Sequence, residues 1–123
     1  MIGKAYISTF QYYNRCTQRM DFKSRPVLII GKADDADYVV LPISRVTNVV
    51  NLDPEYDFQI TPEDFPLMNL TRRSYVRTHK QSIIHAGELV REIIDFREAY
   101  YDEYIDIIAK VEDFQKSIIN NAL

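Results

Sequence analysis

Arg25 and Ser44 are the residues whose types and positions suggest chemistry most directly. Arg25 precedes Pro26 at the start of the apolar run 27–30, and Ser44 closely follows a second apolar run, 38–41. If the two runs pair as antiparallel strands, the beginning of the first lies beside the end of the second. A guanidinium and a hydroxyl then share one rim of a sheet. This combination suits an anionic ligand, and phosphate above all.

The segments around these residues favour a β-hairpin. Both runs are rich in β-branched residues, and the polar stretch 31–37 between them has the Gly and Asp residues of a turn. Pro26 restricts Arg25 to extended conformations, and Pro42 does the same to Leu41. We therefore expect the two runs to be strands deep inside a small sheet.

Length and composition describe one ordinary globular domain. The chain has 123 residues, of which 46% are hydrophobic and 27% charged. It has no apolar run of the roughly 20 residues that span a bilayer and no signal-peptide pattern. Cys16 is the only cysteine, which excludes an intrachain disulfide and a cysteine-based metal site. We expect a reducing, cytoplasmic location, no membrane association, and a passive thiol at Cys16.

The net charge of −3 conceals an asymmetry. Residues 87–123 hold nine acids and four bases, whereas residues 1–86 hold nine acids and eleven bases. The bases of the first part lie mostly in two groups, Arg15, Arg19, Lys23 and Arg25, and Arg72, Arg73, Arg77 and Lys80. A nucleic acid would need both groups on one face of the molecule, because neutralised phosphates supply most non-specific affinity. The alternative is scattered, solvated charge.

The rest of the first part reads as further strands. Residues 3–10 alternate as a first strand, and residues 11–22 show no period and indicate a mobile loop. In that loop Tyr12 and Tyr13 either stack on bases or pack at the edge of the sheet. Residues 56–60 alternate as another strand, and Thr61 is placed to cap a helix of about one turn.

Residues 74–84 predict a strand or a bent pair of strands. Along them Tyr75, Arg77 and His79 point to one face, while Thr78 and Lys80 point to the other.

The C-terminal part predicts a long helix. Ala86-Gly87 marks a boundary between a barrel, residues 1–86, and a helical tail, residues 87–123. Residues 88–122 contain neither Gly nor Pro, and apolar residues recur there at spacings of three and four. An unbroken helix would extend about 50 Å, more than a small barrel covers. Either the helix breaks near residues 95–98 or it crosses to a second chain.

Three segments, KSRPVLII, YVVLPIS and SYVRTHKQ, resemble in order and spacing the MazF/PemK-type toxins of bacterial toxin–antitoxin systems. The resemblance covers residues 3–86. It implies a mainly β fold, an SH3-like small barrel, to which this chain adds a long C-terminal helix. It also implies a homodimer that cleaves single-stranded RNA at selected sequences without metal or other cofactor. A bound antitoxin protein would neutralise it.

The family's catalytic positions fall on Arg25, Ser44 and the triplet Arg77-Thr78-His79. The triplet corresponds to an Arg-x-Asp of the PemK-type branch, and His79 stands where that branch has Asp. An imidazole suits general acid or base work near neutral pH. Arg25 and Arg77 would stabilise phosphorane charge, Arg25 being also a possible acid, and Ser44 would orient the phosphate. Candidate contacts to the RNA backbone are Lys23, Arg45, Arg73, Thr78 and Lys80.

Plainer interpretations remain open. Arg25 would then pair with an acid of the 34–37 turn, and Ser44 would merely end a strand. The competing function is an interaction module, in which the same barrel binds RNA or protein through a degenerate nuclease site. His79 and Lys80 depart from the family and favour this alternative. A small metabolic enzyme is disfavoured, because the sequence shows no cofactor loop, metal cluster or nucleophile–base pair.

Overall fold

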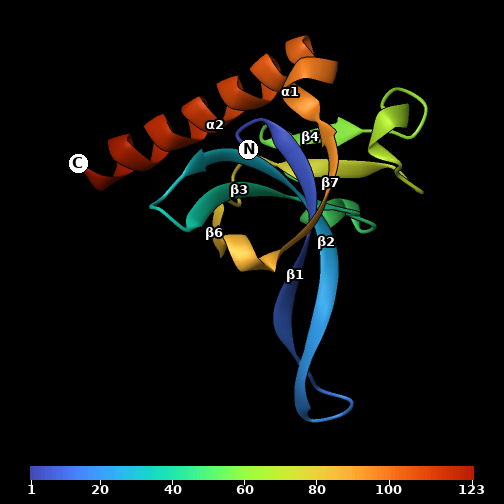
Figure 1. Ribbon diagram of the computed structural model, residues 1–123. Coiled ribbons are helices and arrows are strands. Elements are labelled where there is room, and N and C mark those ends of the chain that lie inside the picture. The colour runs from blue at the N-terminus through green and yellow to red at the C-terminus, as the bar shows by residue number, and fades with distance from the viewer.

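The computed structural model describes all residues 1–123 and consists of a curled antiparallel β-sheet with a C-terminal helix (Figure 1). The predicted class, mainly β with a C-terminal α element, is therefore confirmed. The strands are β1 (Lys4–Asn14), β2 (Arg19–Lys32), β3 (Asp37–Ser44), β4 (Asp57–Ile60), β5 (Ser74–Arg77), β6 (Ser82–His85) and β7 (Leu89–Asp95). The helices are α1 (Phe96–Ala99) and α2 (Tyr101–Ala122), with single 3₁₀ turns η1 (Val49–Asn51), η2 (Pro66–Met68) and η3 (Ala86–Glu88).

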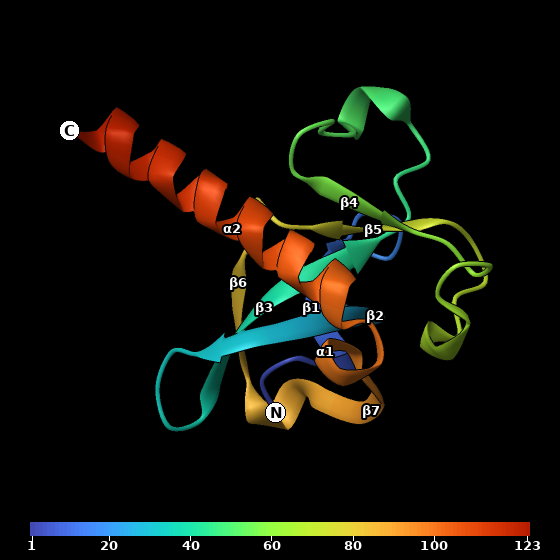
Figure 2. The ribbon, with the colours of Figure 1, turned by 90° about the horizontal axis from the view of Figure 1, so that it is seen from above.

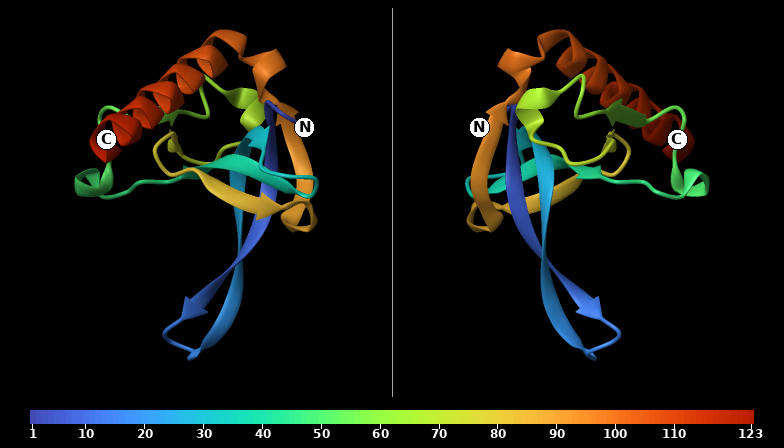
Figure 3. Two further views of the ribbon diagram at one scale, coloured as in Figure 1. Left: turned by 90° about the vertical axis from the view of Figure 1, so that its left-hand side faces the viewer. Right: turned by 90° about the vertical axis from the view of Figure 1, so that its right-hand side faces the viewer.

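The sheet order is β4-β5-β3-β2-β1-β7, and β6 also pairs with β3. One edge of β3 is thus shared, because Ile43 and Ser44 pair with β5 while residues 37–40 pair with β6. A register shift between Ile29 and Gly31 of β2 marks a bulge, which increases local twist. This irregularity and the divided edge accompany the curl of the sheet seen in Figure 3.

The predicted hairpin of two deep strands is confirmed. β2 and β3 pair antiparallel with Val27 opposite Pro42 and Leu28 opposite Leu41. Leu28 and Leu41 belong to the larger core, whereas Val27 belongs to a smaller core on the opposite face. Burial on both faces explains why these strands are continuous apolar runs rather than alternating ones.

The prediction of a mobile loop at residues 11–22 is wrong. β1 and β2 stay paired as far as Asn14 opposite Arg19, and the connecting turn includes Gln18 at φ 57°. This two-stranded ribbon extends well beyond the rest of the sheet (Figures 1 and 3). Since no core lies against it, its residues need not alternate between apolar and polar, and periodicity could not reveal it.

The segments between β4 and β6 largely follow expectation. The Thr61 side chain accepts a hydrogen bond from the backbone N–H of Asp64 at 3.1 Å, as a cap would. The segment forms a turn rather than the expected helix, because Pro66 instead begins η2. Residues 74–84 form a bent strand pair, β5 and β6, with a turn at Thr78 and His79.

The prediction that the helix begins at residue 88 is also wrong. Residues 89–95 form β7, which pairs antiparallel with β1. Helix begins at Phe96, where the Asp95 carboxylate accepts the backbone N–H of Glu98 at 3.2 Å. The helical period slips at 95–98 because this is where strand gives way to helix.

Helix α2 shares the main core with the sheet. Tyr104 and Ile107 of α2 are buried, and Phe96 of α1 stacks on Phe65 with centroids 6.0 Å apart. The helix crosses the sheet, and its C-terminal end projects past it (Figure 2). No helix combines the length and apolar character needed to cross a membrane.

Replacing Phe96 by Ala is expected to lower the free energy of unfolding by about 3–5 kcal/mol. Phe96 is fully buried, so truncation leaves a cavity between the helix and the sheet. Tyr101→Ala is the control, because Tyr101 is 59% exposed and should change stability little. Urea titration of both variants measures the difference. Equal losses of unfolding free energy in the two variants would contradict a specific contribution of Phe96 to core packing.

Candidate functional site

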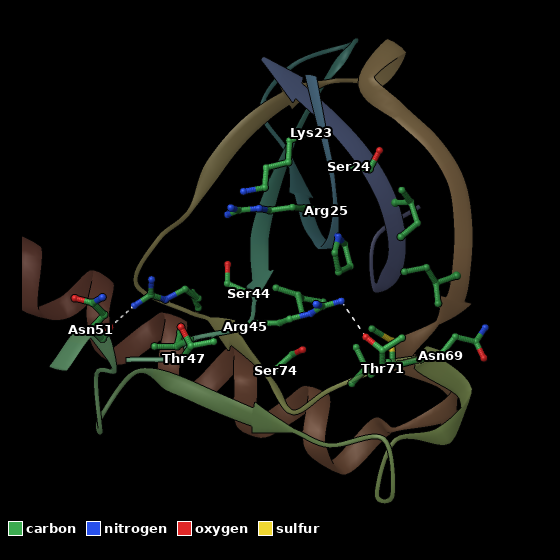
Figure 4. Close-up of a pocket in the computed structure, with 18 of the residues that line it drawn as sticks. Lys23, Ser24, Arg25, Ser44, Arg45, Thr47, Asn51, Asn69, Thr71 and Ser74 are labelled. Atoms are coloured by element: carbon green, nitrogen blue, oxygen red, sulfur yellow. Dashed lines mark hydrogen bonds between the residues drawn. The ribbon is translucent and has the colours of Figure 1, made fainter. Parts of the chain in front are cut away.

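A groove of about 700 Å³ opens where the strand ends meet the loops after β3 and β4 (Figure 4). The middle of β2 supplies Lys23 to Pro26, and the end of β3 supplies Ile43 and Ser44. The expected juxtaposition of Arg25 and Ser44 is present, because both side chains line this groove. It follows from the antiparallel register of β2 and β3.

The lining is basic and polar. Its charged residues are Lys23, Arg25, Arg45 and Arg77, and none of its 19 residues is an Asp, Glu or His. The polar remainder consists of Ser24, Ser44, Thr47, Asn48, Asn51, Asn69, Thr71 and Ser74. Four positive charges without an acid in the lining favour an anionic ligand, and the hydroxyl and amide groups supply hydrogen bonds to it.

Arg25 is held in place without being neutralised. The buried Ser8 hydroxyl donates to the Arg25 carbonyl at 3.0 Å, which fixes the backbone. The guanidinium carbon lies 5.2 Å from the ring centroid of Phe10. Arg25 forms no ion pair, so the interpretation that it pairs with the 34–37 turn is wrong. That turn lies at the other end of the β2–β3 hairpin.

Arg45 and Lys23 flank Arg25 and Ser44. Arg45 donates a 2.9 Å hydrogen bond to the Thr71 hydroxyl, which joins the loops after β3 and after η2 (Figure 4). The Lys23 ammonium lies 5.7 Å from the ring centroid of Tyr12. Neither base has a carboxylate partner, so both charges remain available to a ligand.

Arg77 lines the groove as an ion pair with Asp57. Its Nε lies 3.0 Å from Asp57 Oδ1, and one terminal nitrogen donates to Oδ2 at 3.3 Å and to the Asn51 carbonyl at 2.8 Å. The Asp57 side chain is fully buried, and Asp57 lies directly opposite Arg77 in the β4–β5 ladder. It also accepts the Asp53 backbone N–H at 2.8 Å. Arg77 therefore fixes the 51–53 segment beside the groove, at the cost of part of its own charge.

His79 lies outside the groove. Its ring is 6.0 Å from that of Tyr56 and 6.2 Å from that of Phe114 on α2. Its buried Nδ1 is 3.9 Å from Asp57 Oδ1 and makes no hydrogen bond. Burial lowers the pKa of His79 below its ordinary 6.5, although the Asp57 and Asp53 carboxylates act in the opposite direction. A histidine so placed is neutral at neutral pH and packs α2 against the sheet.

The other predicted contact residues divide clearly. Lys23 and Arg45 line the groove, whereas Arg73, Thr78 and Lys80 do not. Thr78 is buried and donates its hydroxyl hydrogen to the Tyr56 carbonyl, so its role is structural. Five further residues of the groove lie in loops and were not predicted from the sequence: Thr47, Asn48, Asn51, Asn69 and Thr71. The only sequence signal for these residues is that they have hydrogen-bonding side chains and lie close to Arg45 or Arg72 in the chain.

No protein-family model matches the chain, and no curated protein is significantly similar to it in sequence. Inference about function therefore depends on the groove and on the three short motifs.

The free energy of unfolding is expected to fall as the pH decreases from about 7.5 towards 5, with a contribution from His79. The pKa of His79 is lowered in the folded state, so the unfolded chain binds more protons in this range. The contribution is complete above the unfolded pKa near 6.5 and is lost as the pH falls towards the folded pKa. His79→Gln should flatten this pH dependence in urea titrations. His85→Gln, at an exposed position, is the control, and an unaltered profile in His79→Gln would contradict the assignment.

Asp57→Ala is expected to destabilise the protein by about 3–5 kcal/mol, because it leaves the Arg77 guanidinium partly buried and without its carboxylate. The double variant Asp57→Ala/Arg77→Ala removes both charges and should be more stable than Asp57→Ala alone. A double-mutant cycle in urea measures this coupling. If the losses of unfolding free energy in the two single variants add up to that in the double variant, the two side chains act independently.

Proposed function

We propose that the protein is an endoribonuclease that cleaves single-stranded RNA without a metal ion. The observation that carries this proposal is the groove lined by four basic side chains and no acid, with Arg25 beside Ser44. An RNA strand carries one negative charge per nucleotide. A lining of this composition neutralises phosphates and offers hydrogen bonds to the sugar and bases around them.

Single-stranded RNA suits the groove better than a duplex. Sequence-selective RNA recognition targets unpaired bases, whose edges can reach amide and hydroxyl groups. Asn48 and Asn51 at η1 and Asn69 after η2 provide such amides from two loops, beside the basic residues. A groove of about 700 Å³ holds a few nucleotides. This arrangement supports recognition of a short sequence at the scissile bond.

The proposed reaction uses the 2′-hydroxyl of the RNA as nucleophile. A bond forms between O2′ and phosphorus and the bond to O5′ breaks, which gives a 2′,3′-cyclic phosphate and a 5′-hydroxyl. Arg25 stabilises the charge on the phosphorane, and the Ser44 hydroxyl donates to a non-bridging oxygen. No carboxylate or imidazole lines the groove, so the 2′ proton passes to water. Arg25 is the group we assign to protonate O5′, and it then recovers a proton from water.

The resemblance to MazF/PemK toxins extends this proposal to the biological role. The curled sheet would then be an SH3-like barrel, and the protein would be the toxin of a toxin–antitoxin pair. A homodimer and an antitoxin partner follow from the same resemblance. An acidic antitoxin segment would complement Lys23, Arg25 and Arg45, which have no carboxylate partners within the chain.

A second candidate is an RNA-binding module that does not cleave. It is favoured by the position of His79, which packs against Tyr56 and Phe114 rather than in the groove. In this alternative the groove keeps its affinity for RNA and lacks a side-chain base. Binding without cleavage separates the two candidates.

Purified protein is expected to cut a long single-stranded RNA in EDTA, and Arg25→Ala should reduce the rate by about 10²–10³-fold. Ser44→Ala should also slow cutting, because it removes a hydrogen bond to the phosphate. His79→Gln should retain most activity, since His79 lies outside the groove. Mapping the ends tests for a 2′,3′-cyclic phosphate.

Lys32→Ala is the matched control for Arg25→Ala, because Lys32 is an exposed base on the same strand but outside the groove. The activity of a variant is compared with that of the wild type only if both have the same unfolding midpoint. RNA binding by wild-type protein without any cleavage would reject the nuclease and favour the binding module. Cleavage unaffected by Arg25→Ala would reject the assigned site.

A further inference from the structure

The ribbon formed by residues 8–25 of β1 and β2 and their connecting turn, here called the arm, extends away from the sheet (Figures 1 and 3). Its base is part of the groove, because Lys23 and Arg25 line it. From Arg25 to Arg19 the strand covers roughly 20 Å. The arm therefore offers a surface continuous with the groove but outside it.

The strand register assigns the arm's side chains to two faces, because residues directly opposite each other share a face. One face, here called the ladder face, carries the pairs Ser8–Arg25, Phe10–Lys23, Tyr12–Asp21 and Asn14–Arg19. The other carries Thr9–Ser24, Gln11–Phe22 and Tyr13–Met20. Basic residues of the strands are thus confined to the ladder face.

Cations and aromatic rings alternate along the ladder face. The Arg25 guanidinium carbon is 5.2 Å from the ring centroid of Phe10, and the Lys23 ammonium is 5.7 Å from that of Tyr12. The aromatic residue in each case lies diagonally across the ribbon from its cation. A ring face stabilises a cation without removing its charge, so both side chains are preorganised and still positive.

The arm's charge favours the same class of ligand as the groove. Residues 8–25 contain four bases, Arg15, Arg19, Lys23 and Arg25, and one acid, Asp21, a net charge of +3. Asp21 is occupied locally, because it accepts the backbone N–H of Phe22 at 2.9 Å and lies 3.5 Å from the Asn14 amide. None of the four bases forms an ion pair.

We propose that single-stranded RNA leaving the groove continues along the ladder face, with phosphates at Lys23 and Arg19 and a base stacked on Tyr12. Non-specific single-strand sites combine such a cationic track with aromatic platforms. The arm thereby lengthens the footprint on RNA beyond the nucleotides that the groove holds. This inference rests on the proposed function in taking RNA as the ligand, but it does not require cleavage.

The chain contains a matched control for the Lys23–Tyr12 pair. Lys32 lies 5.7 Å from the ring centroid of Tyr38, the same distance, at the opposite end of β2. That pair adjoins the acidic turn with Asp34, Asp35 and Asp37 and lies outside the groove. Changes at Lys32 and Tyr38 thus remove an equivalent lysine and tyrosine without touching the arm.

The experiment measures binding of full-length protein to 2′-O-methyl RNA, which lacks the nucleophile and cannot be cut. Mixed-sequence oligonucleotides of about 4 and about 12 nucleotides are compared by fluorescence anisotropy at several salt concentrations. Tyr12→Ala should weaken binding of the longer RNA by roughly 5- to 100-fold and that of the shorter one little. Tyr12→Phe should restore the affinity, because it keeps the ring.

Lys23→Ala should lower the salt dependence for the longer RNA by about 0.7 in the log–log slope, as expected for one lost phosphate contact. Lys32→Ala and Tyr38→Ala should bind both RNAs like the wild type. Unchanged binding of the longer RNA by Tyr12→Ala would overturn the inference. So would equal weakening for both lengths, since the arm would then only shape the groove.

The failure of the inference and that of the proposed function give different results. If wild-type protein binds neither oligonucleotide, RNA is not the ligand and both are rejected. If it binds both lengths equally well, RNA recognition by the groove stands and the arm has no part in it. Loss of binding to poly-glutamate in the arm variants, with RNA binding intact, would assign the ladder face to an acidic protein and overturn the inference.

Discussion

The antiparallel pairing of β2 with β3 is the constraint on which the rest of the structure depends. Leu28 and Leu41 are fully buried on one face of this pair, and Val27 packs into a second cluster on the other. A one-residue slip would exchange the two faces along the whole strand and put each core's side chains into the other core, so close packing of different residues on the two sides fixes the register. That register brings the middle of β2, where Arg25 lies, beside the end of β3. The position of Arg25 near Ser44 is therefore a consequence of core packing.

The affinity of the groove for an anion depends on which of its basic side chains already have a carboxylate partner. Arg77 is paired with the buried Asp57, and this pair supports the 51–53 segment through the Asn51 carbonyl. Arg25 and Lys23 are instead packed against aromatic rings. A carboxylate neutralises a guanidinium, whereas a ring face orients it and leaves its charge. The same residue type thus serves structure at one wall of the groove and remains available to a phosphate at the other.

The sequence predicted the parts of the fold that hydrophobic burial determines. The hairpin of β2 and β3, the bent strand pair after Ser74 and the C-terminal helix follow from apolar runs, turns and helical spacing. The arm could not be predicted in this way, because no core packs against it and its sequence therefore shows no apolar periodicity. The apolar residues of β7 also fit helical spacing, so the sequence predicts helix there, and only the pairing of β7 with β1 distinguishes strand from helix. Loop residues such as Asn69 and Thr71 could be assigned to the groove only from the folded structure.

His79 illustrates why residue type and strand position do not define a site. In sequence it stands two residues after Arg77, and both side chains do approach the same carboxylate, that of Asp57. β5 ends at Arg77, however, and the turn that follows carries His79 to Tyr56 and Phe114. The carboxylate beside Arg77 comes from the neighbouring strand β4, through a direct cross-strand pair. An arginine–carboxylate pair is thus present although the triplet 77–79 contains no acid, and the histidine instead anchors α2.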